Sequence, residues 1–208
     1  MVRIALTKGR IEKKAVEILS KAGYDISELE DKGRKLVFKL GDADIEVVLA
    51  KAADVITYIE HGVCDVGIVG EDTIMEHGKW FHEILDLNFG KCKFALAGIK
   101  GRDFYAGYTH KVIASKYPNV TKNYFNSKGL DVEVVKIEGS VELAPILGLA
   151  DAIVDIVETG STLKENGLEV YEDVAYISTR LIVNTASIKI KKSEIDELVG
   201  RISAQIEK

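Results

Sequence analysis

Strand-like and helix-like segments alternate along almost the whole chain of 208 residues. Apolar, partly β-branched runs predict strands that are covered on both faces, and the segments between them show the apolar spacing of amphipathic helices. Strands are expected at 2–6, twice within 34–51, and at 65–70, 93–99, 111–115, 132–137 and 151–157; helices are expected at 11–22, 52–62, from Glu71, at 118–128, from Val141, and at 193–206 with Ser193 as N-cap. This alternation is typical of an α/β fold with a largely parallel sheet and crossover helices.

Two parts of the chain resemble each other in sequence. Residues 51–65 (KAADVITYIEHGVCD) align without gaps with residues 137–151 (IEGSVELAPILGLAD), and residues 19–26 align with residues 125–132. Units of helix, glycine, aspartate and strand are common in α/β folds, so chance similarity is one explanation. The other explanation is a true repeat, which predicts two similar α/β lobes with a ligand cleft between them.

The last part of the chain is expected to return to the first lobe, as it does in two-lobed folds whose strands cross over. The first lobe is therefore predicted to be discontinuous, formed by residues 1–90 and 180–208. Residues 91–179 are predicted to form the second lobe, which contains the main candidate binding loop.

That loop is the stretch DIVETGSTL, residues 155–163. It follows an apolar strand pattern and precedes a short helix that Gly167 closes, so its polar residues lie at the carboxyl end of a strand, where open α/β sheets bind ligands. Free amides at a helix start favour phosphate, and Gly160 permits a close approach and a positive φ. The candidate binding residues of this loop are Asp155, Glu158, Thr159, Gly160, Ser161 and Thr162.

The two acids of the loop, Asp155 and Glu158, repel phosphate and must face another group. Ionised carboxylates only accept hydrogen bonds, so the vicinal hydroxyls of a ribose are suitable partners. The pattern then predicts a ribose 5-phosphate site. The alternative is structural: Thr159 or Ser161 caps the helix, and the acids complement its dipole.

Basic residues follow other predicted strands. The first strand leads into Lys8-Gly9-Arg10, and Lys51 lies at a further strand end. Two cations beside a glycine suit a polyanion such as pyrophosphate, although for KGR taken alone a solvated helix start is the more ordinary explanation. The equivalent loop of the second half contains Gly139 and Ser140, where Ser140 is also a candidate N-cap.

Charge and composition exclude several classes of protein. A formal net charge of -5 argues against nonspecific nucleic-acid binding. No run approaches the ~20 apolar residues of a membrane span, and MVRIALTKGR leads into a strand instead of a signal peptide. Cys64 and Cys92 fit reduced core thiols, and the four histidines form no metal or nucleophile pattern. A cytoplasmic protein is expected.

The stretch ELAPILGLADAIVDIVETGSTL, residues 142–163, resembles the signature of the ATP phosphoribosyltransferase family. ALTKGRI, DVITYIEHGVCDVGIVGED and GSVELAP resemble the same family, so the likeness covers almost the whole chain. The resemblance implies two α/β lobes like those of type II periplasmic binding proteins. It also implies transfer of a 5-phosphoribosyl group from phosphoribosyl pyrophosphate to N1 of ATP, with Mg²⁺, as the first step of histidine biosynthesis.

Carried over to this chain, the family's binding residues assign the ribose hydroxyls to Asp155 and Glu158 and the 5-phosphate to residues 159–162. Lys8 and Arg10, with Lys51, would meet the pyrophosphate or the ATP phosphates. Many relatives have Arg-Pro where this chain has Lys51-Ala52, and lysine lacks the bidentate fork of arginine. No catalytic base is expected, because adenine N1 has a free lone pair, and the metal ligands are not predicted.

The resemblance further implies a short-form subunit, a homodimer that assembles with a regulatory subunit resembling histidyl-tRNA synthetase. Two other functions fit the same residues. One is a small-anion binding protein with the same two-lobed fold, since fold does not fix function. The other is a phosphoribosyltransferase that acts on a different base.

Overall fold

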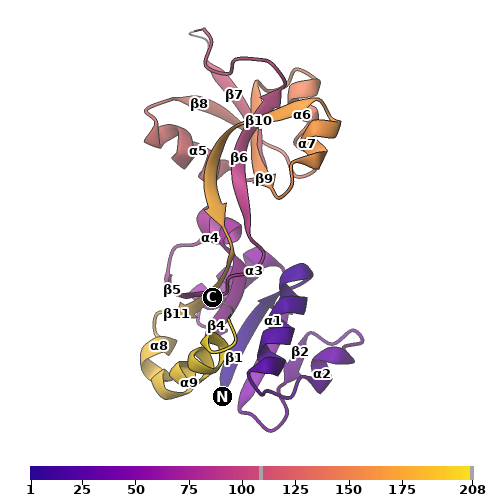
Figure 1. The fold of residues 1–208 in the computed structure, drawn as a ribbon. Coiled ribbons are helices and arrows are strands. Elements are labelled where there is room, and N and C mark those ends of the chain that lie inside the picture. The colour runs from indigo at the N-terminus through magenta and orange to yellow at the C-terminus, as the bar shows by residue number, and fades with distance from the viewer. Residues whose placement is uncertain (108–109, 207–208) are drawn as a thin grey trace. The chain divides into compact units, whose positions relative to one another are not determined.

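The computed structural model describes residues 1–107 and 110–206. The chain divides into two compact units, which we call the first unit (Met1–Gly90 with Ser178–Lys208) and the second unit (Lys91–Ile177). Each unit contains one sheet, and the chain passes between the units twice (Figure 1). Tyr108 and Thr109 of the predicted second lobe, and Glu207 and Lys208 of the predicted first lobe, lie outside the described residues.

The first unit has a mixed six-stranded sheet in the order β2-β3-β1-β4-β11-β5. Strands β3, β1 and β4 are parallel, whereas β2, β11 and β5 are antiparallel to their neighbours. The strands are β1 (Val2–Thr7), β2 (Val37–Lys39), β3 (Ile45–Ala50), β4 (Val66–Gly70), β5 (Phe81–Asp86) and β11 (Thr179–Asn184); the helices are α1 (Arg10–Lys21), α2 (Ser27–Glu30), α3 (Ala52–Glu60), α4 (Glu71–His77), α8 (Ser187–Ile190) and α9 (Lys192–Ser203).

Helices cover both faces of this sheet. Apolar residues of α1, α2 and α9 pack on one face, and Val55, Ile56 and Ile59 of α3 pack on the other. The buried strands therefore read as nearly continuous apolar runs. This arrangement leaves the loops at the carboxyl ends of β1, β3 and β4 at one edge of the sheet.

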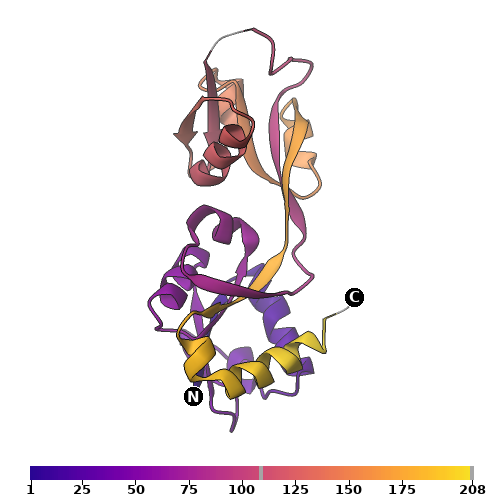
Figure 2. The same ribbon diagram turned by 90° about the vertical axis from the view of Figure 1, so that its left-hand side faces the viewer.

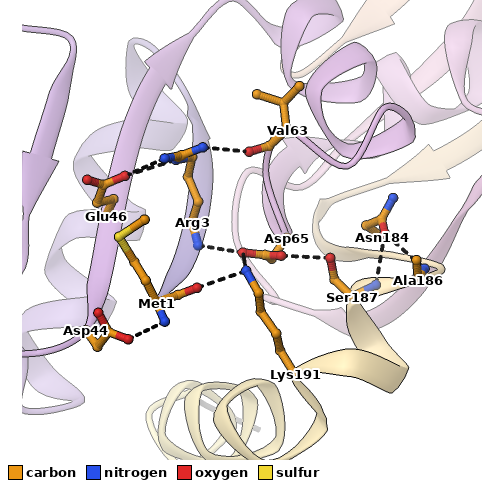
Figure 3. A network of polar contacts seen from close by, with 10 residues as sticks. All are labelled: Met1, Arg3, Asp44, Glu46, Val63, Asp65, Asn184, Ala186, Ser187 and Lys191. Carbon is orange, nitrogen blue, oxygen red and sulfur yellow. Dashed lines mark hydrogen bonds and ion pairs between the residues drawn. The ribbon is translucent and has the colours of Figure 1, made fainter.

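A buried polar network fastens the C-terminal segment to the first strand (Figure 3). Asp65 accepts hydrogen bonds from the backbone N–H of Arg3 at 2.8 Å, the hydroxyl of Ser187 at 2.7 Å and the ammonium of Lys191 at 2.8 Å. Lys191 also donates to the backbone oxygen of Met1, which places α8 and α9 beside the N-terminus (Figure 2). The prediction of Ser193 as N-cap is wrong, because α9 begins at Lys192.

The second unit has a mixed five-stranded sheet in the order β10-β6-β9-β7-β8. Strands β9, β7 and β8 are parallel, and β6 runs antiparallel to both β9 and β10. The strands are β6 (Cys92–Ile99), β7 (Lys111–Ser115), β8 (Val132–Lys136), β9 (Ala152–Val157) and β10 (Leu168–Ile177); the helices are α5 (Pro118–Ser127), α6 (Leu143–Ile146) and α7 (Ser161–Glu165). Helix α5 packs on one face, and α6 and α7 pack on the other.

Two further sequence-based expectations need correction. Both sheets are mixed instead of largely parallel, because β5, β6, β10 and β11 run against their neighbours. The helix expected from Val141 begins at Leu143, so Ser140 is not its N-cap. Pro145 lies in the first turn of α6, where a missing backbone N–H costs little.

The aligned segments of the two units do make equivalent contacts. Asp65, just before β4, accepts the N–H of Arg3 at 2.8 Å and donates its own N–H to the oxygen of Arg3 at 2.8 Å. Asp151, just before β9, makes the same pair of contacts with Val112 at 2.9 and 2.8 Å. The parallel pair β1–β4 of the first unit therefore corresponds to the pair β7–β9 of the second. In the described residues, no helix is long and apolar enough to cross a membrane.

Candidate functional site

Strand β9 ends at Val157, as the sequence predicts, and its last residues lead into the first turn of α7. Glu158, Thr159 and Gly160 form the connecting turn. Gly160 is the N-cap of α7 with φ 75°, and it occupies the left-handed region that side chains with a Cβ rarely adopt. The turn is tight because the chain reverses there from the end of a buried strand to a helix that packs on the sheet.

The loop encloses a cavity of about 290 Å³ within the second unit. All six residues predicted from DIVETGST line it. The complete lining is Glu142, Asp155, Ile156, Val157, Glu158, Thr159, Gly160, Ser161, Thr162 and Leu163. The lining therefore combines three carboxylates with three hydroxyl-bearing residues and the start of α7.

Hydroxyl groups of the loop point toward one another. The hydroxyls of Thr159 and Ser161 lie 3.1 Å apart, and the backbone N–H of Ser161 approaches the Thr159 hydroxyl at 3.4 Å. Thr159, Ser161 and Thr162 are all exposed. The N-cap of α7 is Gly160, so neither Thr159 nor Ser161 occupies the N-cap position that the sequence suggested for them.

Asp155, like Glu142, is a half-buried carboxylate of the site. Burial raises its pKa above the ordinary value of 3.8, and the negative charge of Glu142 raises it further. The backbone N–H of Ile156 and the positive charge of Lys116 act in the opposite direction. Burial removes water that would donate hydrogen bonds to this carboxylate. Hydroxyl donors of a ligand can replace those hydrogen bonds and stabilise the ionised form.

The sequence prediction missed Glu142 as a site residue. It lies one residue before α6, outside the DIVETGST loop, yet it lines the same cavity and its charge acts on Asp155. Glu142 belongs to the stretch GSVELAP, but only Gly139 and Ser140 of that stretch were predicted as binding residues. Both of those residues are exposed in the loop after β8 and do not line the cavity.

The predicted basic residues gather in the first unit, at the carboxyl ends of two adjacent parallel strands. Thr7 of β1 lies opposite Ala50 of β3, and the N–H of Lys8 donates to the oxygen of Ala50 at 2.9 Å. Lys51 is the next residue, at the N-cap of α3. The side chains of Lys8 and Lys51 are exposed, and neither forms an ion pair within residues 1–107 and 110–206.

The KGR loop is held by an acid on α1. Glu12 accepts the N–H of Gly9 at 3.1 Å and forms an ion pair with Lys32. Burial raises the pKa of Glu12, but the hydrogen bonds from Lys32 and Gly9 outweigh it, so the pKa is lowered. The charge of Lys8 also acts on Glu12, but the ion pair that Glu12 forms is with Lys32.

Two further features concern metal ligands and the cysteine thiols. No group of three His, Cys, Asp or Glu side chains is placed there to hold a metal ion. Cys64 is buried, and burial raises the pKa of its thiol to about 11, which leaves it unreactive.

Comparisons with known proteins point to one family. The family model described as HisG: ATP phosphoribosyltransferase matches residues 51–204. The chain is 62% identical over 205 residues to an ATP phosphoribosyltransferase of Clostridium kluyveri, with 99% of this chain and 94% of that protein covered. It is 58% identical over 207 residues to that of Clostridium acetobutylicum, with 100% and 96% covered.

Solved structures agree with the sequence comparison. An ATP phosphoribosyl transferase (HisG:HisZ) complex from Thermotoga maritima matches with TM-score 0.85 and 36% identity over 99% of this chain and 98% of that one. The aliphatic sulphonate binding protein SsuA of Escherichia coli matches with TM-score 0.60, covering 98% of this chain and 72% of that one. Its 13% identity supports the fold alone, and it confirms the predicted two-lobed fold of the type II periplasmic-binding-protein kind.

Proposed function

The chain belongs to the ATP phosphoribosyltransferase family, and we propose that the loop after β9 binds the ribose 5-phosphate part of its donor substrate. The chain is a pentosyltransferase of histidine biosynthesis. It transfers the 5-phosphoribosyl group from phosphoribosyl pyrophosphate to N1 of ATP. In this reaction the N1–C1 bond forms, the bond from C1 to the pyrophosphate oxygen breaks, and pyrophosphate leaves.

The cavity beside α7 is the observation that carries the binding proposal. Hydroxyls of Thr159, Ser161 and Thr162 and the amides around Gly160 bind the 5-phosphate. Each hydrogen bond to a charged group contributes about 1.5 to 3 kcal/mol. Asp155 and Glu158 accept hydrogen bonds from the two ribose hydroxyls, which are the only neutral donors that the donor sugar offers at this distance from its phosphate.

We assign the basic loops of the first unit to the remaining phosphates. Lys8 and Lys51, exposed at adjacent strand ends, and Arg10 with Gly9 bind the pyrophosphate of the donor or the phosphates of ATP. Gly139 and Ser140, in the exposed loop after β8 of the second unit, keep the same assignment. Cations at these positions stabilise the negative charge that develops on the leaving group.

The chain needs no general base for this reaction. Adenine N1 attacks with a lone pair, so no proton leaves the nucleophile before the bond forms. The role of the protein is to align N1 with C1, which makes the step effectively unimolecular, and to keep water away from C1.

The proposed function includes Mg²⁺, which would bind together with phosphoribosyl pyrophosphate. In proteins this ion commonly binds through one or two carboxylates together with substrate phosphates. Glu142 and Asp155 line one cavity and influence each other electrostatically, so this pair fits such a shared ion. When bound, Mg²⁺ supplies charge neutralisation to the pyrophosphate.

The solved relative from Thermotoga maritima is a HisG:HisZ complex. We propose that this chain likewise assembles with a second kind of subunit, a regulatory one that resembles histidyl-tRNA synthetase, and that it also forms a homodimer. The cytoplasm is the proposed compartment, because the reaction consumes ATP.

Calorimetric titration with phosphoribosyl pyrophosphate tests the site. The double variant Ser161→Ala with Thr162→Val is expected to weaken donor binding by roughly a hundredfold, since it removes two hydrogen bonds to a dianion. Ser203→Ala on α9, also an exposed serine, serves as the control and is expected to bind normally. Unchanged donor affinity in the double variant would contradict the proposed site, and an absorbance assay of the product with ATP tests the reaction itself.

A further inference from the structure

Lys116 lies beside the candidate site but has no role in the reaction described above. It follows β7 directly, and Ser115 at the end of β7 is the register partner of Val154 in β9. Because the two strands are parallel, Lys116 comes next to Asp155 at the same edge of the sheet. Its side chain is exposed, and its ammonium forms neither an ion pair nor a hydrogen bond in the part of the chain that the structure describes.

The cavity lacks a cation of its own. Its lining contains three carboxylates, Glu142, Asp155 and Glu158, and no lysine or arginine. The positive charge of Lys116 nevertheless acts on Asp155 and also on Glu138 in the neighbouring loop. An anionic ligand that enters this acidic site therefore meets Lys116 as the one compensating charge on the described β7 and β9 strand ends.

The repeat supports the same role. Strand β7 of the second unit corresponds to β1 of the first, because Asp151 and Asp65 make the same backbone contacts to them. Strand β1 ends next to Lys8, another exposed lysine without an ion pair among the described residues. The corresponding strand of each unit thus leads into an unpaired lysine at the carboxyl edge of its sheet.

Sheet order indicates which phosphate Lys116 meets. Helix α7 packs against β10, on the side of β9 where β6 and β10 lie, whereas β7 lies on the other side of β9. The donor carries its 5-phosphate at one end and its pyrophosphate on C1 at the other. With the 5-phosphate at α7 and the diol at Asp155, the pyrophosphate extends toward β7.

We propose that Lys116 binds the pyrophosphate group of phosphoribosyl pyrophosphate, which is the leaving group of the reaction. The inference rests on the proposed binding of the ribose 5-phosphate at the loop after β9. The ammonium donates hydrogen bonds to pyrophosphate oxygens, and no covalent step is involved.

The test compares three ligands by calorimetric titration: phosphoribosyl pyrophosphate, inorganic pyrophosphate and ribose 5-phosphate. Lys116→Ala is expected to weaken the first two by roughly tenfold or more and to leave ribose 5-phosphate unchanged. Lys116→Arg, which keeps the charge, is expected to retain most of the affinity. Lys122→Ala serves as the matched control, because Lys122 is an exposed lysine on α5 of the same unit.

Each alternative outcome has a distinct meaning. Unchanged donor affinity in Lys116→Ala, or an equal weakening of ribose 5-phosphate binding, would overturn the role of Lys116. The double variant Ser161→Ala with Thr162→Val is titrated in parallel. If that variant leaves ribose 5-phosphate binding intact, the proposed phosphate site fails, whatever the result at Lys116. Equal melting temperatures of the variants confirm that each one folds.

Discussion

Glu71 accepts two hydrogen bonds from Arg180 on one carboxylate oxygen, from Nε at 3.1 Å and from Nη2 at 2.8 Å. The same oxygen lies 3.2 Å from the backbone N–H of Ser178. The guanidinium also reaches Asp86 at 3.1 Å and Glu83 at 3.4 Å. One cation on β11 therefore holds three acids from β5 and the start of α4, next to the point where the chain leaves and re-enters the first unit.

Arg180→Met is expected to destabilise the protein by about 2 to 4 kcal/mol, because it leaves three acids close together in a partly buried place. The free energy of unfolding from denaturant titration measures the effect. Adding Glu71→Gln to this variant removes one of the repelling charges and is expected to recover at least about 1 kcal/mol. If the second substitution instead adds its own loss in full, the acids do not act as a coupled group.

Gly160→Ala is expected to lower stability by about 1 to 2 kcal/mol, since a Cβ makes the left-handed conformation costly. Space is not the cause, because the nearest atom to an added Cβ is Val157 Cγ1 at 3.7 Å, an ordinary contact. The turn that presents the amides should deform as well, so donor binding is expected to weaken. Thermal unfolding and donor titration check the two effects.

Gly200→Ala is the matched control for that substitution. Gly200 lies within α9, is exposed, and has no atom within 4 Å of an added Cβ. Alanine is the better helix former, so stability is expected to rise by about 0.5 to 1 kcal/mol with donor binding unchanged. A loss of stability at Gly200 comparable to the loss at Gly160 would show that the left-handed backbone is not the cause.

Asp155→Asn is expected to weaken donor binding and to raise the melting temperature. Burial, followed by the charge of Glu142, raises the pKa of Asp155 above 3.8, whereas the N–H of Ile156 and the charge of Lys116 oppose the rise. A group whose pKa is higher in the folded than in the unfolded protein stabilises the fold at pH values below its unfolded pKa. This contribution is lost as the pH rises through its folded pKa. At neutral pH the ionised carboxylate thus destabilises the fold, and asparagine removes this cost.

The pH dependence distinguishes this explanation from better packing of the amide. The gain in melting temperature of Asp155→Asn over the wild type should be present at pH 7 and shrink as the pH falls toward 4. A gain that is the same at both pH values would contradict the charge argument. In the wild type, donor affinity should also fall with decreasing pH, because protonated Asp155 no longer accepts both hydroxyl hydrogen bonds.

The sequence predicted the parts of the fold that have a strong local pattern. Strand β9 and its polar turn follow from an apolar run that stops at Val157, and α4 begins at Glu71 as expected. Strand β10 was not predicted, because its ten residues contain two register shifts that break the alternation of exposed and covered side chains. The mixed strand directions of the two sheets could not be predicted from the sequence either, since they depend on pairing between distant segments.

The candidate site also has one part that the sequence predicted and one part that it did not. Asp155 to Thr162 are consecutive and carry a local signal, so all six predicted residues of that stretch line the cavity. Glu142 and Lys116 come near Asp155 only through tertiary structure, from the loop before α6 and from the end of β7. Contacts between separate strand ends are not visible in one sequence without an independent sign of which strands are neighbours.

Asp65→Asn is expected to cost about 2 to 4 kcal/mol at neutral pH, because it removes the charge that pairs with Lys191 in a buried place. Burial raises the pKa of Asp65, but hydrogen bonds from Lys191, Arg3 and Ser187 outweigh it, so the pKa lies below 3.8. A lowered pKa contributes stability above the unfolded value, and this contribution is lost as the pH falls through the folded value. The wild type should therefore lose stability below about pH 4 more steeply than Asp65→Asn.

Asp151→Asn is the matched control, because Asp151 makes the same contacts to its neighbouring strand without an ammonium partner among the described residues. Parallel stability curves for the wild type and Asp65→Asn between pH 7 and 3 would contradict the role given to Asp65.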